Sequence, residues 1–594
     1  QEVTLWQLAV AMVGWIEHWI KSLDRLTESL ELDDHPHHTG IVPDWLYHLA
    51  EGVANTVGEL ADDIKLVASA LSGMVANLSA DSSKHSAVQH RALAGVMVGV
   101  RGHLHRRYGK LVAGAGADQD IIDDIRRLFI CLDLGITVMK GVFDDGVIRG
   151  GFDVINDIDF RDWLRKHGGN EELSVNSAPV RGFYDLVFAY EGGDFDKPNI
   201  EAGTLLRAMA RIGLCYKGGI MFKMQAGMGD VVFTPLYEAL LARGVKFKFF
   251  HKVEELVPDG QQIGSIRMTQ QVQLQAATQE YQPLVDVKGL ACWPSHPQYA
   301  QIDADQAELL QVKEINLESH WSDWPQVYRE RFGKELPALT LRRGVDFDQV
   351  VFGISIGSLP VLCPQLLAQS PALLATSENV ATVATQAYQV WLDKDLTQMG
   401  WAYQPDGQQP VLSGFTEPYD TWAPMDQLLV HEDWPPGAEP RNVSYFCSAL
   451  TVSDYPPVTD TGFPARMAQQ AKDGAIHQLS QQIASLWSAA GPAGAFPWQW
   501  LVDASGATGV QRFDAQYWRA NVDPSERYVM SLVGSTRYRL RTDQSGFSNL
   551  FLTGDWIRTG LNAGCVEAAV MAGMQTSRAM SGHPQVIDGE TDFA

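Results

Sequence analysis

The spacing of apolar residues changes along the chain from a helical period to short apolar runs and alternation. In the first 216 residues, apolar positions recur at the spacing that places them on one face of a helix. Asp159 is placed to cap one such helix, and Gly168 to end it. Helices are predicted over residues 5–23, 53–78, 121–142, 159–168, 181–190 and 203–216.

From residue 227 the pattern is that of a mixed α/β protein. Glycines open and close a predicted helix over residues 227–244, and Val245 to Phe250 alternates as a strand. Further strands are predicted over residues 263–273, within 346–360, where a glycine turn follows the strand, and over 382–392. Helices and strands in this succession predict an α/β sheet built from separate parts of the chain.

The stretch from Asn549 to Gly573 combines three elements that favour a ligand site. A short apolar run ends at Gly554 and Asp555, a small and uncharged turn leads to Gly564, and a helix begins near Val566. Backbone N–H groups at such a turn and helix start can hold a phosphate-bearing or electron-rich ligand, and the helix dipole favours negative charge there. We therefore expect a cofactor at this turn.

This stretch resembles the C-terminal FAD motif of the flavin amine oxidase and phytoene desaturase superfamily. The resemblance rests on Gly554-Asp555, on Gly560 and Gly564, and on the Val-Glu-x-Ala helix start that contains Glu567. It implies that Asp555 holds the ribityl or pyrophosphate part of FAD and that the N–H groups of Cys565 and Val566 face the pyrimidine edge of the flavin. Gly554 and Gly564 would form the turn, and Glu567 would support the start of the helix.

Two earlier segments, residues 227–256 and 346–360, extend the resemblance. The second is similar to the strand and glycine turn that lead from the FAD domain back to the substrate domain. Residues 227–256 are similar to the superfamily segment that returns to the FAD domain, where the residue matching Val253 contacts the adenine through its backbone. The implied fold is mixed α/β, with a discontinuous Rossmann-like FAD-binding domain and a mixed substrate domain that has a helical N-terminal region. The expected parts are 1–150 (helical region of the substrate domain), 151–225 (helical cavity-lining segment), 226–365 (FAD-domain segment with a β-rich insertion), 366–545 (substrate domain) and 546–594 (C-terminal FAD-binding segment).

The strand, GxGxxG turn and helix of a complete Rossmann half are missing from the 594 residues. The nearest string, Gly114-Ala-Gly116, lacks the third glycine and follows no β-rich segment. Either a separate polypeptide supplies this half, or the sequence is a piece of a longer chain. We expect a heteromer, because a flavin without its pyrophosphate loop binds poorly and an open parallel-sheet edge is a liability.

The resemblance implies removal of a hydride from a small organic substrate, in the manner of a dehydrogenase or desaturase. Amine oxidases of the superfamily often carry two tyrosines beside the flavin and a lysine on a substrate-domain strand. This chain has Phe551 and Cys565 at the tyrosine positions, and Lys394 lies just beyond the aligned strand. An amine or amino-acid oxidase and a non-catalytic scaffold subunit remain as alternatives, and no catalytic base can be named.

Composition and charge indicate which binding partners and which cellular compartment to expect. A net charge of −25 argues against a protein that tracks nucleic-acid phosphates. No apolar run reaches the ~18 residues that span a bilayer. His35, His37 and His38 with Asp33 and Asp34 are expected in a solvated loop, since Pro36 interrupts metal-ligand spacing. A reducing cytoplasm is expected, because the cysteines are scattered singly: Cys131, Cys215, Cys292, Cys363, Cys447 and Cys565.

Overall fold

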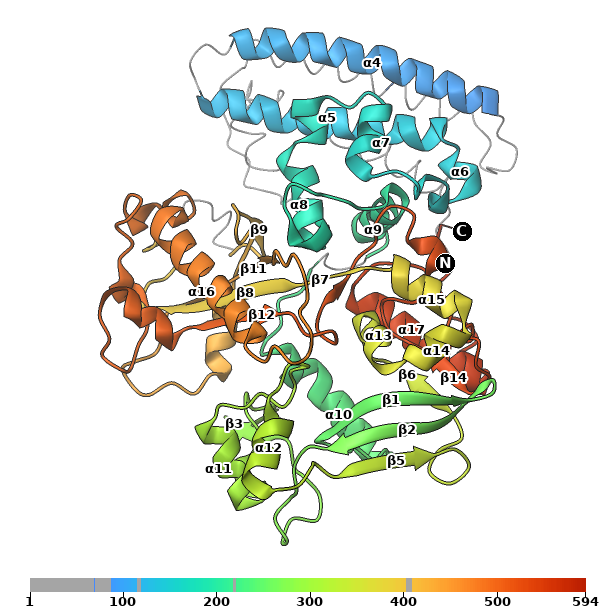
Figure 1. The fold of residues 1–594 in the computed structure, drawn as a ribbon. Coiled ribbons are helices and arrows are strands. Elements are labelled where there is room, and N and C mark those ends of the chain that lie inside the picture. Colours follow the sequence, from blue (N-terminus) through green and yellow to red (C-terminus); the bar gives the residue numbers. More distant parts are fainter. Residues whose placement is uncertain (1–68, 70–86, 115–118, 217–220, 402–408, 594) are drawn as a thin grey trace.

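The computed structural model describes residues 69, 87–114, 119–216, 221–401 and 409–593, and its fold is mixed α/β, as predicted (Figure 1). The helices predicted over 5–23 and 53–78 and the histidine loop at 33–38 lie outside these residues, apart from residue 69. The helices are α4 Ala87–Gly114, α5 Gln119–Asp144, α6 Val147–Gly150, α7 Phe160–Lys166, α8 Ala178–Leu186, α9 Ala202–Leu214, α10 Thr234–Ala242, α11 Ala304–Val312, α12 Trp324–Phe332, α13 Leu359–Leu362, α14 Pro364–Gln369, α15 Pro371–Asn379, α16 Phe463–Gln481 and α17 Val566–Ser581. The strands are β1 His251–Asp259, β2 Gln262–Gln270, β3 Val285–Val287, β4 Leu290–Cys292, β5 Ala338–Arg342, β6 Val350–Phe352, β7 Thr382–Val383, β8 Thr385–Leu392, β9 Ser413–Gly414, β10 Thr421–Pro424, β11 Asn442–Ala449, β12 Tyr517–Asn521, β13 Tyr528–Val529 and β14 Leu550–Leu552.

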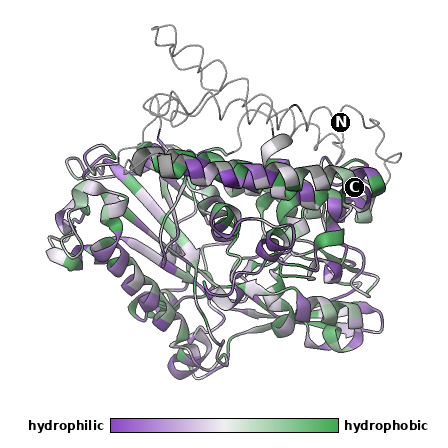
Figure 2. Cartoon of the chain, turned by 90° about the horizontal axis from the view of Figure 1, so that it is seen from above, coloured by the Kyte–Doolittle hydropathy of each residue, from purple (hydrophilic) through white to green (hydrophobic). Residues whose placement is uncertain are grey.

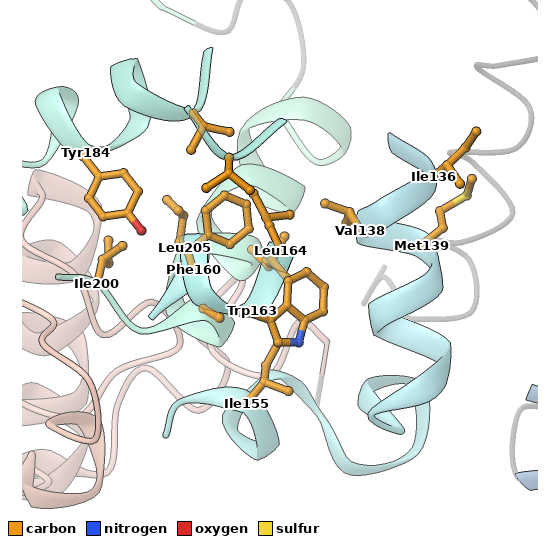
Figure 3. Close-up of a cluster of buried hydrophobic side chains, with 14 of the residues drawn as sticks. Ile136, Val138, Met139, Ile155, Phe160, Trp163, Leu164, Tyr184, Ile200 and Leu205 are labelled. Atoms are coloured by element: carbon orange, nitrogen blue, oxygen red, sulfur yellow. The ribbon is translucent and has the colours of Figure 1, made fainter. Parts of the chain in front are cut away.

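The long helices α4 and α5 lie side by side and form a layer over the shorter helices α6 to α9 (Figure 1). Polar and apolar residues are interleaved along α4 (Figure 2). Beneath this layer, Val138 and Met139 of α5 belong to one apolar core with Phe160, Trp163 and Leu164 of α7 (Figure 3). The short helices are therefore anchored through large side chains to α5.

The predicted capped helix at 159–168 is confirmed. The Asp159 carboxylate accepts hydrogen bonds from the N–H groups of Arg161 at 2.9 Å and Asp162 at 3.4 Å. Gly168 has a φ of 81°, a conformation that glycine adopts without strain. Local signals alone thus fix both ends of α7.

A five-stranded antiparallel sheet in the order β12-β8-β11-β10-β9 packs against α16. The strand predicted over 382–392 is present, with a break at Ala384 that divides it into β7 and β8. The core between the sheet and α16 is aromatic, and Tyr388, Trp422 and Trp487 are fully buried in it. These rings fill a core and do not line a cavity, so they give no evidence about a substrate.

The strand predicted at Val245 to Phe250 is wrong. Within the described residues this segment pairs with no strand, Phe250 has a φ of 59°, and β1 begins only at His251. Phe247 and Phe249 pack instead against Tyr237 of α10, with ring centroids 4.7 Å and 6.2 Å apart. Alternating apolar residues form a strand only where a neighbouring strand completes the hydrogen-bond ladder. The β1-β2-β5 sheet that follows is antiparallel.

A two-stranded parallel sheet made of β6 and β14 joins two parts of the chain that are far apart in sequence, with Phe551 opposite Val351. Helices α13 to α15 and α17 pack around it through a core that includes Leu366, Leu552 and Trp556. The glycine-rich turn of interest leaves this sheet at the end of β14. No helix in the described part of the chain has both the length and the apolar character needed to cross a membrane.

Candidate functional site

The strand, turn and helix predicted over 549–573 are confirmed as β14, a loop and α17. Gly554 follows the strand with a φ of 124°, which favours glycine. Gly564 ends the loop, and a Cβ atom there would lie 2.7 Å from the Tyr528 ring and 2.9 Å from the Val529 carbonyl oxygen. Both glycines are therefore required by the backbone, one by its conformation and one by a close approach.

Hydrogen bonds inside the loop fix its shape. The Thr559 hydroxyl accepts from the N–H groups of Leu561 and Asn562, each at 3.1 Å, and the Asn562 side chain accepts from Thr559 N at 2.8 Å. The Ser531 hydroxyl donates to the Asn562 carbonyl at 2.7 Å, and the Tyr528 hydroxyl donates to the Gly564 carbonyl. The backbone that leads into α17 is thus held from within and from the β13 segment.

The first turn of α17 presents backbone N–H groups at the end of this loop. Cys565 is extended at the N-cap, with φ −164° and ψ 161°, and its side chain makes no capping hydrogen bond. The first N–H groups of a helix have no partner within the helix, and the dipole makes this end positive. Val566 is 50% exposed, so the start of the helix is open to a ligand.

Glu567 lies in this first turn and is exposed. Its carboxylate accepts a hydrogen bond from the Tyr216 hydroxyl at 2.9 Å. A carboxylate near a helix N-terminus is favoured by the dipole. Glu567 therefore contacts the segment after α9. Its support of the helix start stays a prediction.

Asp555 lies at the beginning of the loop, and burial raises the pKa of its carboxyl group, while the nearby Arg539 charge acts in the opposite direction. Among the described residues no side chain, Arg539 included, forms a hydrogen bond or salt bridge with this carboxylate, and its hydrogen-bond partner is the backbone N–H of Asp555 itself. Its backbone carbonyl is occupied, because it accepts from Arg539 Nη1 at 2.7 Å. The side chain of Asp555 is therefore available to a polar ligand group.

Val253 is separate in sequence but packs against the same core. It pairs with Met268 in the β1–β2 ladder, and the register shifts between Val253 and Glu255. Its side chain packs against the cluster that contains Leu552 and Trp556. The structure therefore connects β1 and the end of β14 through one core, while a contact between Val253 and adenine stays a prediction.

Three residues of the site region were not predicted from the sequence: Tyr528, Arg539 and Glu201. Tyr528 closes the turn at Gly564, as described above. Arg539 is 2% exposed and bridges Asp555 to Met530. Glu201 is fully buried and accepts from Thr536 N at 2.7 Å. No local pattern marks these residues, because each acts across a long separation in sequence.

The donor set at the turn fits an electron-rich or anionic group. The donors are the N–H groups of the α17 start, and Gly564 stands where a side chain would collide. The Asp555 carboxylate is an acceptor that hydroxyl donors could use. A flavin nucleotide offers both kinds of group, so the residues present fit one end of FAD. Asp555, Cys565 and Val566 would hold it.

A polar cavity of about 510 Å³ lies elsewhere, at the start of α7. Charged residues of this region line it, among them Asp157, Arg161 and Arg165. None of the predicted cofactor residues contributes to it. Most of the loop before α17 is buried, and the exposed positions begin at Val566 and Glu567, in the first turn of the helix.

Comparison with known proteins does not identify a family for this chain. The chain matches no protein-family model and no curated protein. Among solved structures it is similar to an oxidoreductase from Methanosarcina mazei, with 12% sequence identity and a TM-score of 0.25. The similarity covers 42% of this chain and 46% of that chain, so this chain spans less than half the length of that protein. A likeness of this size carries no argument about fold or function.

Proposed function

We propose that this protein is an FAD-dependent oxidoreductase that removes a hydride from an organic substrate. The observation that carries the proposal is the turn between β14 and α17, with an Asp555 carboxylate that no other side chain binds and a helix start that is exposed at Val566. FAD, when bound, supplies the hydride acceptor. The chain contributes binding and electrostatics: Asp555 would accept hydrogen bonds from hydroxyl groups, and the N–H groups of Cys565 and Val566 would stabilise negative charge.

The proposal includes a second polypeptide that supplies the N-terminal half of the FAD site. In its support, the β6–β14 sheet has only two strands among the described residues, and Val351 at its centre is 46% exposed. Parallel sheets are normally larger and covered on both faces. Beside it, α17 exposes an apolar stripe formed by Val566, Val570 and Met574, which are 50%, 51% and 42% exposed. Such surfaces favour further strands and helices packed against this part of the chain.

An amine or amino-acid oxidase is the second candidate, and the geometry gives it less support. Phe551 lies in β14 and Cys565 is the N-cap residue of α17, at the positions where the related oxidases often have tyrosines. Lys394 lies outside β8, and its amino group is 3.5 Å from the Asp393 carboxylate. A lysine held in this way offers no evident contact with a flavin at the α17 start.

A visible spectrum of the protein, purified with its natural partners, tests the proposal. Flavin absorption that is bleached by a candidate substrate without oxygen supports hydride removal. Release of hydrogen peroxide and ammonia in air would identify the oxidase alternative. A colourless complex would contradict the proposal and favour a scaffold subunit.

Identification of the co-purifying chain tests the second part. We expect a polypeptide whose sequence contains a strand, a GxGxxG turn and a helix. A preparation with full FAD content and no polypeptide besides this one would contradict the heteromer.

A further inference from the structure

Arg539 is a buried cation that ties two segments of the candidate site together. Its guanidinium donates to the Asp555 carbonyl at 2.7 Å, to the Met530 carbonyl at 2.9 Å and to the Ser531 hydroxyl at 3.2 Å. Ser531 in turn donates to Asn562, inside the loop. One side chain therefore fixes the start of the loop against the segment that holds its middle.

The charge of Arg539 is not neutralised by a direct partner. Among the described residues it forms no salt bridge, and its Nε has no hydrogen-bond partner. Among acidic side chains, Glu201 has the largest electrostatic effect on Arg539. The Glu201 carboxylate forms its own hydrogen bonds elsewhere: it accepts from the Thr204 hydroxyl at 2.7 Å and from the Thr536 hydroxyl at 2.5 Å. Burial lowers the pKa of Arg539, yet a guanidinium keeps its proton in proteins.

A buried charge without a direct ion pair is costly to maintain, because it gives up its hydration and is compensated only by more distant acids such as Glu201. The field of this charge reaches Asp555, Cys565 and Tyr528, all of which border the loop before α17. In a buried site such a charge acts more strongly than it would in water. The charge of Arg539 and the N-terminal end of the α17 dipole are both positive, so both favour negative charge at the loop before α17.

We propose that Arg539 is a positioning residue of the flavin site with two separable effects; this inference rests on the proposed function. Its fork of N–H groups holds the Asp555 backbone so that the loop is shaped for the cofactor. Its positive charge favours the reduced flavin, which carries more negative charge than the oxidised ring, and so raises the reduction potential. Arg539 itself is 2% exposed, and it holds the loop through its hydrogen bond to the Asp555 carbonyl.

Two variants of the complete complex separate these effects. Arg539→Gln removes the charge and keeps a hydrogen-bond donor, so we expect a lower reduction potential and FAD binding weakened roughly tenfold. Arg539→Lys keeps the charge and loses the fork, so we expect weaker FAD binding with a potential close to that of the wild type. Arg537→Gln is the matched control, because this neighbour is 60% exposed and its salt bridge is with Asp157 at the surface.

A reduction potential is the deciding readout, since a purely structural role would change stability and leave the potential of the bound flavin unaltered. An unchanged potential in Arg539→Gln would overturn the role of the charge. Unchanged FAD affinity in Arg539→Lys would overturn the role of the fork, and this variant decides if Arg539→Gln fails to fold. A wild-type complex without flavin would instead contradict the proposed function, and is therefore a distinct outcome.

Discussion

The hydroxyl of Tyr528 donates a hydrogen bond to the backbone carbonyl of Gly564, the residue that precedes the N-cap of α17. The Tyr528 ring lies so close that a Cβ atom on Gly564 would be 2.7 Å from two of its carbon atoms. Burial raises the pKa of this tyrosine, so it stays a hydrogen-bond donor at neutral pH. An aromatic ring from one segment thus sets the path of the candidate cofactor turn.

Replacement of Gly564 by alanine should therefore displace the turn. We expect a loss of about 1–3 kcal/mol in the free energy of unfolding, the usual cost of overpacking, together with loss of bound FAD. Gly573→Ala is the matched control, because a Cβ there meets no atom within 4 Å. That control should be neutral or slightly stabilising, since alanine favours a helix interior. Flavin absorbance and thermal unfolding measure both effects, and normal FAD content in Gly564→Ala would contradict the assignment.

Asp555→Asn tests the free carboxylate. The variant should weaken FAD binding about tenfold, or ~1.4 kcal/mol, because an amide accepts hydrogen bonds from hydroxyl groups less strongly. Its stability should not fall, since burial already raises the pKa of Asp555 and disfavours its charge. Asp543→Asn, at an exposed position on the preceding loop, is the control. Equal FAD affinity in the two variants would exclude Asp555 from the binding site.

The apolar stripe on α17 is open to a test of assembly. Val570→Asp should abolish association with the second polypeptide, because it places a charge in the expected interface. Val586→Asp should not, since Val586 is 79% exposed and lies beyond the helix. Size-exclusion chromatography of the co-expressed chains gives the result. Normal assembly of Val570→Asp would remove this face of α17 from the interface.

Asp420 should make stability depend on pH. It is fully buried just before β10 of the five-stranded sheet, and burial together with Asp185 and Glu417 raises its pKa to about 8, against the opposing effects of Thr421 and Arg181. The folded state therefore holds a proton that the unfolded state has released, so stability falls as pH rises from about 4 to about 8 and is constant above. Asp420→Asn removes this dependence.

The measurement is the difference in melting temperature between Asp420→Asn and the wild type, recorded from pH 4 to pH 9. The difference should grow up to about pH 8, where Asp420 titrates, and then level off. A difference that is constant over the whole range would show that Asp420 titrates normally. Asp473→Asn, on the exposed side of α16, provides the background.

Local signals in the sequence predicted the helices α7, α9 and α17 and the strand β8, because caps, glycines and apolar spacing lie within each element. They did not predict Arg539, since the exposed Arg537 and the buried Arg539 stand in the same polar stretch. Burial there depends on Asp555 and Met530, which the fold brings together. The strand proposed at Val245 to Phe250 was wrong for a related reason: its pattern is local, but its ladder needs a neighbour.

The five-part division of the chain and the cofactor contacts stay predictions. The most direct test is to denature the natively purified complex and to identify and count the flavin released. The account predicts FAD in a ratio of about one per 594-residue chain, and its loss from Gly564→Ala but not from Gly573→Ala. Absence of FAD from a fully assembled complex, or equal FAD content in both variants, would contradict it.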